Sequence, residues 1–86
     1  MARYDLRYLT SIARDLRGLP KADVRRVLAK AEKLRDDPYP RGSIKLAGRD
    51  RYRIRQGDYR ILYAVDDTRV LVEIVKIGHR SDVYRN

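Results

Sequence analysis

The chain has 86 residues, of which 43% are hydrophobic, with no cysteine and one histidine. This length accommodates a single core, so we expect one domain over residues 1–86. Without cysteine there is no disulfide bond and no thiolate metal site, which is typical of proteins of the reducing cytoplasm. The charged N-terminal residues and the lack of a long apolar run predict neither a signal peptide nor a membrane-spanning segment.

The charge of the chain is strongly basic and unevenly distributed. A net charge of +9 arises from 21 basic and 12 acidic residues, and 16 of the basic residues are arginine. Residues 41–60 alone hold seven basic and two acidic residues, a net charge of +5. Such a concentration favours a polyanionic partner, and the planar guanidinium group suits phosphates well. The alternative interpretation is a solubilising charge spread over a solvated surface.

The first forty residues predict one strand followed by two helices. Residues 3–8 alternate polar and apolar side chains, which predicts a half-buried strand with its even-numbered side chains inward. Thr10 is a suitable N-cap for a helix that ends at residues 18–20, where glycine and proline mark a stop and a new start. Apolar residues then recur at helical spacing at Leu9, Ile12, Ala13, Leu16 and Leu19, and again at Val24, Val27, Leu28, Ala31 and Leu34.

The rest of the chain predicts antiparallel strands. Residues 36–42 contain two prolines and a glycine, so no helix continues through them. Strands are expected at residues 44–46, 51–56, 59–65 and 70–77, with tight turns at 57–58 and 66–68, an end at Gly78 and a tail over 79–86. The predicted fold class is therefore α+β, with an N-terminal strand, a helical hairpin, an antiparallel three- to four-stranded meander sheet and a short C-terminal tail.

Strand parity gathers several arginines on one face of this sheet. If Gly57 and Asp58 form a two-residue hairpin loop, Gln56 pairs with Tyr59 and the register of both strands is fixed. The face that can pack on the helices then carries Tyr52, Ile54, Tyr59, Ile61, Tyr63 and Val65. The opposite face carries Arg51, Arg53, Arg55 and Arg60, beside Leu62 and Ala64.

A purely structural sheet has little reason to collect these arginines. Like charges placed directly across a strand pair destabilise it by about 0.2–1 kcal/mol each. A phosphate ligand supplies the missing negative charge, so the cluster favours a nucleic-acid partner. The alternative is that these side chains extend into solvent or pair with Asp50, Glu73 or Asp82.

Four stretches carry a more specific signal: KLAG at residues 45–48, YRIR at 52–55, GDYRILY at 57–63 and VKIGHRSDVY at 75–84. In this order and spacing they resemble the RelE/ParE superfamily of bacterial and archaeal toxins, and the strand and helical hairpin before them fit as well. The resemblance implies a RelE-like mRNA interferase, a toxin that cleaves mRNA in the ribosomal A site. It implies attack by the 2′-hydroxyl group without metal or cofactor, and a cognate RelB-like antitoxin that blocks the toxin in a hetero-oligomer.

The resemblance also implies roles for individual residues. By motif position, the catalytic residues are Arg53, Arg55, Arg60, Arg80 and Tyr84. Arg60 and Arg80 would neutralise the scissile phosphate, and Tyr84 would stack on a base or lie near the attacking hydroxyl group. Lys45, Arg49 and Arg51 are expected to contact RNA beside them.

The proton acceptor of this reaction stays open. In RelE itself the positions of Arg53 and Arg55 are commonly lysine, and arginine remains protonated, so it is a poor general base. His79 is the one side chain with an ordinary pKa near neutrality, which makes it a further catalytic candidate. The other interpretation of His79 is a structural or merely exposed histidine.

Two other functions are compatible with this sequence. One is a ParE-like toxin that inhibits gyrase, although ParE-like chains generally lack the basic catalytic set. The other is a non-catalytic RNA-binding module, which the charge alone would support. The sequence contains no glycine-rich phosphate loop, and its aspartate pairs at residues 36–37 and 66–67 are predicted to form turns.

Overall fold

The computed structural model describes residues 3–47 and 50–79. In the described residues a strand is followed by two helices and a short 3-10 helix, and then by further strands. The elements are β1 (Asp5–Tyr8), α1 (Ile12–Arg17), α2 (Lys21–Glu32), the 3-10 helix η1 (Lys33–Arg35), β2 (Ile44–Lys45), β3 (Arg51–Gln56), β4 (Tyr59–Asp66) and β5 (Leu71–His79). The predicted α+β class is confirmed.

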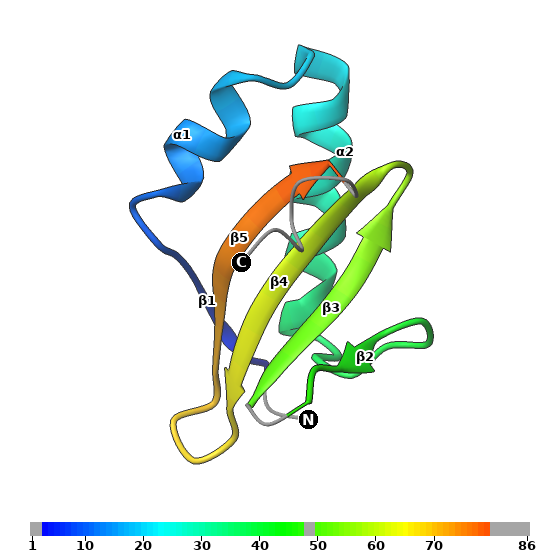
Figure 1. The fold of residues 1–86 in the computed structure, drawn as a ribbon. Helices are drawn as coiled ribbons and strands as arrows, with labels where there is room; N and C mark the ends of the chain where they lie inside the picture. Colours follow the sequence, from blue (N-terminus) through cyan, green and yellow to red (C-terminus); the bar gives the residue numbers. More distant parts are fainter. Residues whose placement is uncertain (1–2, 48–49, 80–86) are drawn as a thin grey trace.

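The strands form one sheet in the order β1-β5-β4-β3-β2. From β2 to β5 each strand pairs antiparallel with the next, which is the predicted meander. The N-terminal strand β1 pairs parallel with β5 and forms the edge of the sheet opposite β2. Figure 1 shows both helices on one side of the sheet, which leaves the other face of the sheet free of helices.

The β3–β4 hairpin has the predicted register. Gln56 pairs with Tyr59 and Arg55 with Arg60, so Gly57 and Asp58 form a two-residue loop. Gly57 has a φ of +59°, in the left-handed region that glycine adopts at little cost. This turn fixes which side chains of both strands share a face.

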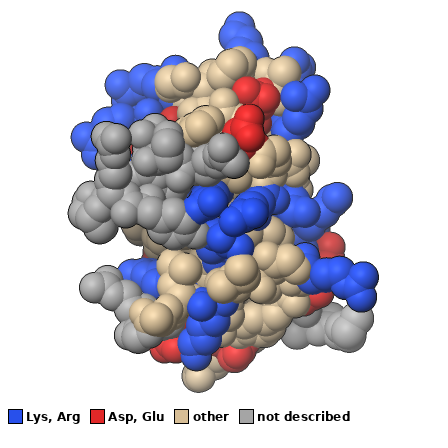
Figure 2. Space-filling model, turned by 45° about the vertical axis from the view of Figure 1, so that its right-hand side comes forward, with Lys and Arg blue, Asp and Glu red and all other residues tan. Residues whose placement is uncertain are grey.

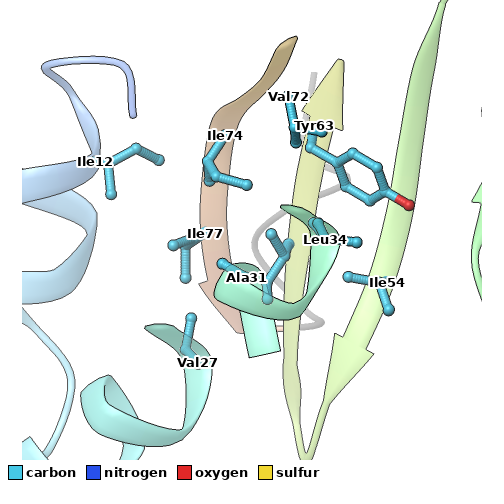
Figure 3. Packing of buried hydrophobic residues seen from close by; sticks show 10 residues of the cluster. Ile12, Val27, Ala31, Leu34, Ile54, Tyr63, Val72, Ile74 and Ile77 are labelled. Carbon is cyan, nitrogen blue, oxygen red and sulfur yellow. The ribbon is translucent and has the colours of Figure 1, made fainter. Parts of the chain in front are cut away.

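The hydrophobic core lies between the helices and the sheet. Figure 3 shows side chains of α1, α2 and η1 meeting those of β3, β4 and β5. The buried members are Ile12, Val27, Ala31, Leu34, Ile54, Ile61, Tyr63, Val72, Ile74 and Ile77. Val27, Ala31 and Leu34 of the predicted second stripe are thus buried, whereas Val24 and Leu28 are half-buried. On the predicted inner face of the hairpin Ile54, Ile61 and Tyr63 are buried, and Tyr52, Tyr59 and Val65 pack against them partly buried.

An irregularity in β5 allows this packing. Ile74 and Ile77 are three residues apart, so strict alternation would put them on opposite faces of the sheet. The pairing of β4 with β5 shifts between Leu62 and Tyr63, and the extra residue brings both isoleucines into the core. Next to the shift, Asp15 of α1 accepts a hydrogen bond from the Ile77 backbone N–H at 3.1 Å, which fastens α1 to β5.

Three local predictions about element ends are wrong. Helix α1 is preceded by Ser11 rather than capped by Thr10, and the Ser11 side chain makes no capping hydrogen bond. Tyr8 is 38% exposed, because β1 lies at the sheet edge and its last residue reaches beyond the core. Gly78 does not end β5, since it pairs with Arg60 inside the ladder and the strand continues to His79.

A carboxylate joins three loops at the lower end of the sheet. Asp67, in the β4–β5 turn, accepts hydrogen bonds from Tyr4 Oη at 2.6 Å and Tyr39 Oη at 2.8 Å. The two hydroxyl groups stabilise the charged form, so the pKa of Asp67 lies below its ordinary value. Nearby, Tyr63 donates to the Pro38 carbonyl at 2.8 Å, and burial raises the pKa of Tyr63 to about 12.

Candidate nucleic-acid interface

The arginines of the central hairpin lie on the face of the sheet that the helices leave free. Pairing of Arg51 with Ala64, Arg53 with Leu62 and Arg55 with Arg60 puts all of these side chains on one face, because paired residues share a side. The intervening residues Ile54 and Ile61 are buried under the helices. The predicted arginine face is therefore present, and we use this name below for Arg51, Arg53, Arg55 and Arg60.

The arginine face presents its charges at regular intervals. Alternate residues of a strand are about 6.7 Å apart, so Arg51, Arg53 and Arg55 form a row about 13 Å long. Arg60 adds a fourth guanidinium group next to Arg55 on the neighbouring strand. This spacing is comparable with that of successive phosphates along an extended nucleic-acid strand. Figure 2 shows lysine and arginine side chains gathered across the middle of the molecule.

These arginines differ in their access to solvent. Arg55 is exposed and Arg60 is half-buried, whereas Arg53 is only 8% exposed. A charge that has lost most of its contact with water acts through a medium of lower effective dielectric constant and attracts an anion more strongly. Arg55 is thus the member of the arginine face that is most open to a ligand, whereas the charges of Arg53 and Arg60 are largely removed from water.

His79 lies on the other side of the sheet from the arginine face. It pairs with Tyr59, and the two rings meet edge to face with centroids 6.0 Å apart. The Tyr59 hydroxyl group donates to Asp23 of α2 at 3.0 Å, which places this aromatic pair on the helix side. The sequence predicted His79 in the tail beyond the last strand, but β5 continues through Gly78 to His79, and the pairing with Tyr59 turns the imidazole toward the helix side.

Lys45 is also separated from the arginine face. It pairs with Tyr52, whose ring packs against the core, so Lys45 has the parity of the helix side. Its Nζ atom lies 3.9 Å from a carboxylate oxygen of Asp50. Three other predicted site residues, Arg49, Arg80 and Tyr84, lie outside the described residues.

Two further charged residues, Arg7 and Glu73, share the face with the arginines; the sequence named Glu73 as a possible ion-pair partner of the cluster and did not select Arg7. Arg7 of β1 pairs with Glu73 of β5, and Glu73 pairs with Ala64 opposite Arg51. The alternation within residues 3–8 already pointed Arg7 outward. The sequence did not predict which strand lies next to β1, because local alternation indicates the face on which a residue lies and not the order of the strands.

The comparisons with known proteins agree with this fold. Over residues 2–84 the chain matches the family described as ParE toxin of type II toxin-antitoxin system, parDE. It is similar to the toxin RelG of Mycobacterium tuberculosis, at 36% identity over 95% of this chain and 97% of that protein.

Solved structures give the same result. The toxin–antitoxin complex RelBE2 from Mycobacterium tuberculosis contains a chain similar to this one, with a TM-score of 0.83, 33% identity and coverage of 95% and 97% of the two chains. The archaeal RelE–RelB complex from Pyrococcus horikoshii contains another, with a TM-score of 0.78, 31% identity and coverage of 94% and 99%.

The chain shares its small α+β fold with the toxin chains of these complexes. The chain belongs to the ParE toxin family of type II toxin–antitoxin systems. Its similarity to RelG and to the solved Rel complexes makes it a RelE-like member, so the expected place in the RelE/ParE superfamily is confirmed. Within residues 3–47 and 50–79, no helix has the length and apolar character needed to cross a membrane.

Proposed function

We propose that this toxin is a ribosome-dependent endoribonuclease that cleaves mRNA in the A site. The observation that carries the proposal is the arginine face, where four guanidinium groups share one side of the β3–β4 hairpin. A gyrase inhibitor acts on a protein partner and has no need for a row of phosphate-spaced cations. A phosphodiester strand is the ligand whose charge and spacing match this face.

The proposed chemistry needs charge stabilisation above all. The 2′-hydroxyl group gives up its proton to water and its oxygen attacks the adjacent phosphorus, so that negative charge builds on the phosphate oxygens. The bond to the 5′-oxygen breaks, this oxygen takes up a proton from water, and a 2′,3′-cyclic phosphate and a 5′-hydroxyl group result. Arg60, together with Arg80, would neutralise this charge, while Arg53 and Arg55 would hold the strand. Tyr84 would stack on a base. His79 is left out of this set because it faces the helices.

The first test replaces Arg60. Expression of the wild-type chain should stop translation and leave mRNA cut within codons, and Arg60→Ala should lower the cutting rate by about 10²–10³-fold, as loss of one charge-stabilising donor does in other enzymes. The matched control is Arg25→Ala, an exposed arginine of α2 on the helix side. Mapping of mRNA 5′ ends after induction measures both.

Other outcomes of the same experiment decide between functions. Intact mRNA together with double-strand DNA breaks would favour the gyrase-inhibiting alternative. An equal loss of cutting in Arg60→Ala and Arg25→Ala would mean that the arginine face makes no specific contribution to mRNA cleavage. RNA binding without any cutting would leave the non-catalytic RNA-binding module.

We also propose a RelB-like antitoxin as the partner in a toxin–antitoxin hetero-oligomer, and the cytoplasm, where ribosomes and mRNA meet, as the place of action. The similar solved chains come from complexes described as RelBE2 and RelE–RelB. An acidic antitoxin segment over the arginine face would compete directly with RNA. The check is whether the product of a short neighbouring reading frame co-purifies with the toxin and prevents cleavage.

A further inference from the structure

A hollow of about 440 Å³ opens on the same face of the sheet as the arginines, toward the end where β3 begins. Its volume falls within the range of ligand pockets, about 300–1,000 Å³. Its walls include Arg7, Arg51, Leu71 and Glu73, with Ala64 between them. None of these residues except Arg51 takes part in the function proposed above.

The sheet register builds this hollow. Arg7, Glu73, Ala64 and Arg51 stand in one row across β1, β5, β4 and β3. With strands about 4.8 Å apart, the two arginines stand about 14 Å from each other. The small side chain of Ala64 leaves space between them, and Leu71, paired with Asp66 in the adjacent row, adds an apolar surface.

The charged groups of this row are available to a ligand. Among the described residues, neither Arg7 nor Arg51 forms an ion pair with Glu73, although Arg7 is its neighbour in the row and Arg51 lies beyond Ala64. Glu73 is half-buried, whereas Arg7 is exposed. The lining of the hollow also includes Asp50, Asp66 and Arg69. Asp50 pairs with Lys45 at 3.9 Å and Asp66 with Arg69 at 3.8 Å, so Glu73 is the half-buried carboxylate of the lining that no ion pair among the described residues occupies.

The position of the hollow connects it to the proposed RNA path. Arg51 and Arg53 are alternate residues of β3, so the row with Glu73 begins about 6.7 Å from the buried Arg53. A strand of RNA held by Arg53 and Arg55 would therefore reach the hollow within about one nucleotide. A base turned toward the sheet would meet Ala64 and Leu71 with its ring and Glu73 with its edge.

Resting on the proposed function, we infer that this hollow is a base-recognition subsite in which Glu73 selects guanine. A carboxylate only accepts hydrogen bonds, and its two oxygens match two adjacent donors. The Watson–Crick edge of guanine offers N1–H and the N2 amino group side by side. Adenine and cytosine offer a single amino group there, and uracil places carbonyl oxygens on both sides of its N–H group, which a carboxylate repels.

The test measures binding without cleavage. The probes are RNA pentanucleotides with 2′-O-methyl riboses, which lack the attacking hydroxyl group, carrying guanosine, inosine or adenosine at the centre of an otherwise identical sequence. The wild-type chain should bind the guanosine probe at least about tenfold more tightly than the adenosine probe, the factor expected for one hydrogen bond to a charged group. Inosine lacks the N2 amino group and should lie between them.

The variant Glu73→Gln should abolish this preference, because an amide presents one acceptor and one donor. Glu32→Gln, which removes the same charge on the helix side, should keep it. In NMR spectra of the wild-type chain, the backbone amide of Leu71 should shift with the guanosine probe. Equal affinities for guanosine and adenosine, failure to bind either probe, or an unchanged preference in Glu73→Gln would each overturn the inference.

Mapping of mRNA cuts separates this inference from the proposed function. If the wild type cuts mRNA and Glu73→Gln cuts it with the same preference for bases, the proposal of a guanine subsite is wrong and the nuclease proposal is retained. If the wild type cuts no mRNA but binds the guanosine probe more tightly, and Glu73→Gln loses this preference, the proposal of a guanine subsite is retained and the nuclease proposal is wrong.

Discussion

At the scale of single residues, Asp67 shows how a short carboxylate stabilises a small fold. Its two oxygens accept hydrogen bonds from Tyr4 and Tyr39, which precede β1 and follow η1. The β4–β5 turn is thereby tied to two segments that are distant in sequence. The Tyr39 ring also meets Tyr52 edge to face at 5.2 Å, so this contact continues into the sheet.

The lowered pKa of Asp67 predicts a stability loss in acid. A carboxyl group with a folded-state pKa below its unfolded value of about 3.9 stabilises the fold above that unfolded value, and this contribution disappears as the pH falls through the folded pKa. Asp67→Asn should be less stable than wild type at pH 7, and the difference should shrink below about pH 4. Urea unfolding midpoints across this pH range measure the effect.

Asp58→Asn is the matched control for this prediction, since Asp58 is an exposed turn aspartate without an ion pair among the described residues. It should leave the acid dependence of the wild type unchanged. A difference between Asp67→Asn and wild type that stays constant down to pH 2 would contradict the proposed role of the two tyrosine contacts.

At the scale of elements, the β3–β4 hairpin fixes the geometry of the candidate site. One residue of slip would exchange the buried isoleucines with the arginines and put the charges under the helices. The left-handed Gly57 prevents this slip because it sets the loop at two residues. The two-residue turn is thus the element on which the arginine face depends most.

Gly57→Ala should therefore destabilise the protein by about 1–2 kcal/mol, the cost of holding an L-residue in the left-handed region. A methyl group at this position meets no atom within 4 Å, so the expected loss is backbone strain alone. Gly18→Ala is the control, because Gly18 has a φ of −84° and the same open surroundings, and it should be neutral or slightly stabilising. Equal unfolding midpoints for the two variants would contradict this account.

The hairpin also shows how far the sequence could predict this structure. The Gly57–Asp58 signal and the alternation on either side were sufficient for the register and for the arginine face, because both are local. The partner of β1 and the irregularity near Ile74 were not predictable, since they depend on how distant strands pack. His79 was misplaced for the same reason: a glycine at position 78 indicates a strand end locally, whereas pairing with Arg60 carries the strand on.

At the scale of the whole molecule, the net charge of +9 dominates encounters with nucleic acid. The acidic residues of the described part of the chain are spread over strands, helices and turns, whereas the arginines of β3 and β4 are concentrated on one face. A partner strand would be attracted over a long range and positioned at short range by the same groups.

RNA affinity should therefore fall steeply with salt. Binding that neutralises three or four phosphates of a single strand has a slope of about −2 to −3 in a plot of log affinity against log salt concentration. Arg55→Ala should reduce this slope by about 0.7, because one phosphate contact is lost. Fluorescence anisotropy with a labelled RNA between 50 and 200 mM salt, a range over which such changes are large, measures both slopes. A slope near zero would exclude an electrostatic interface.

The parallel pairing of β1 with β5 has a consequence for biosynthesis. Asp5–Tyr8 is synthesised before its partner β5, and the other elements of the sheet lie between the two in the chain. Closing a contact of such high sequence separation is slow and must wait for the whole loop. A chain that has been synthesised only as far as β4 therefore lacks Glu73 and the strand that joins β1 to the sheet, so the row of Arg7, Glu73, Ala64 and Arg51 forms only after β5 has been made.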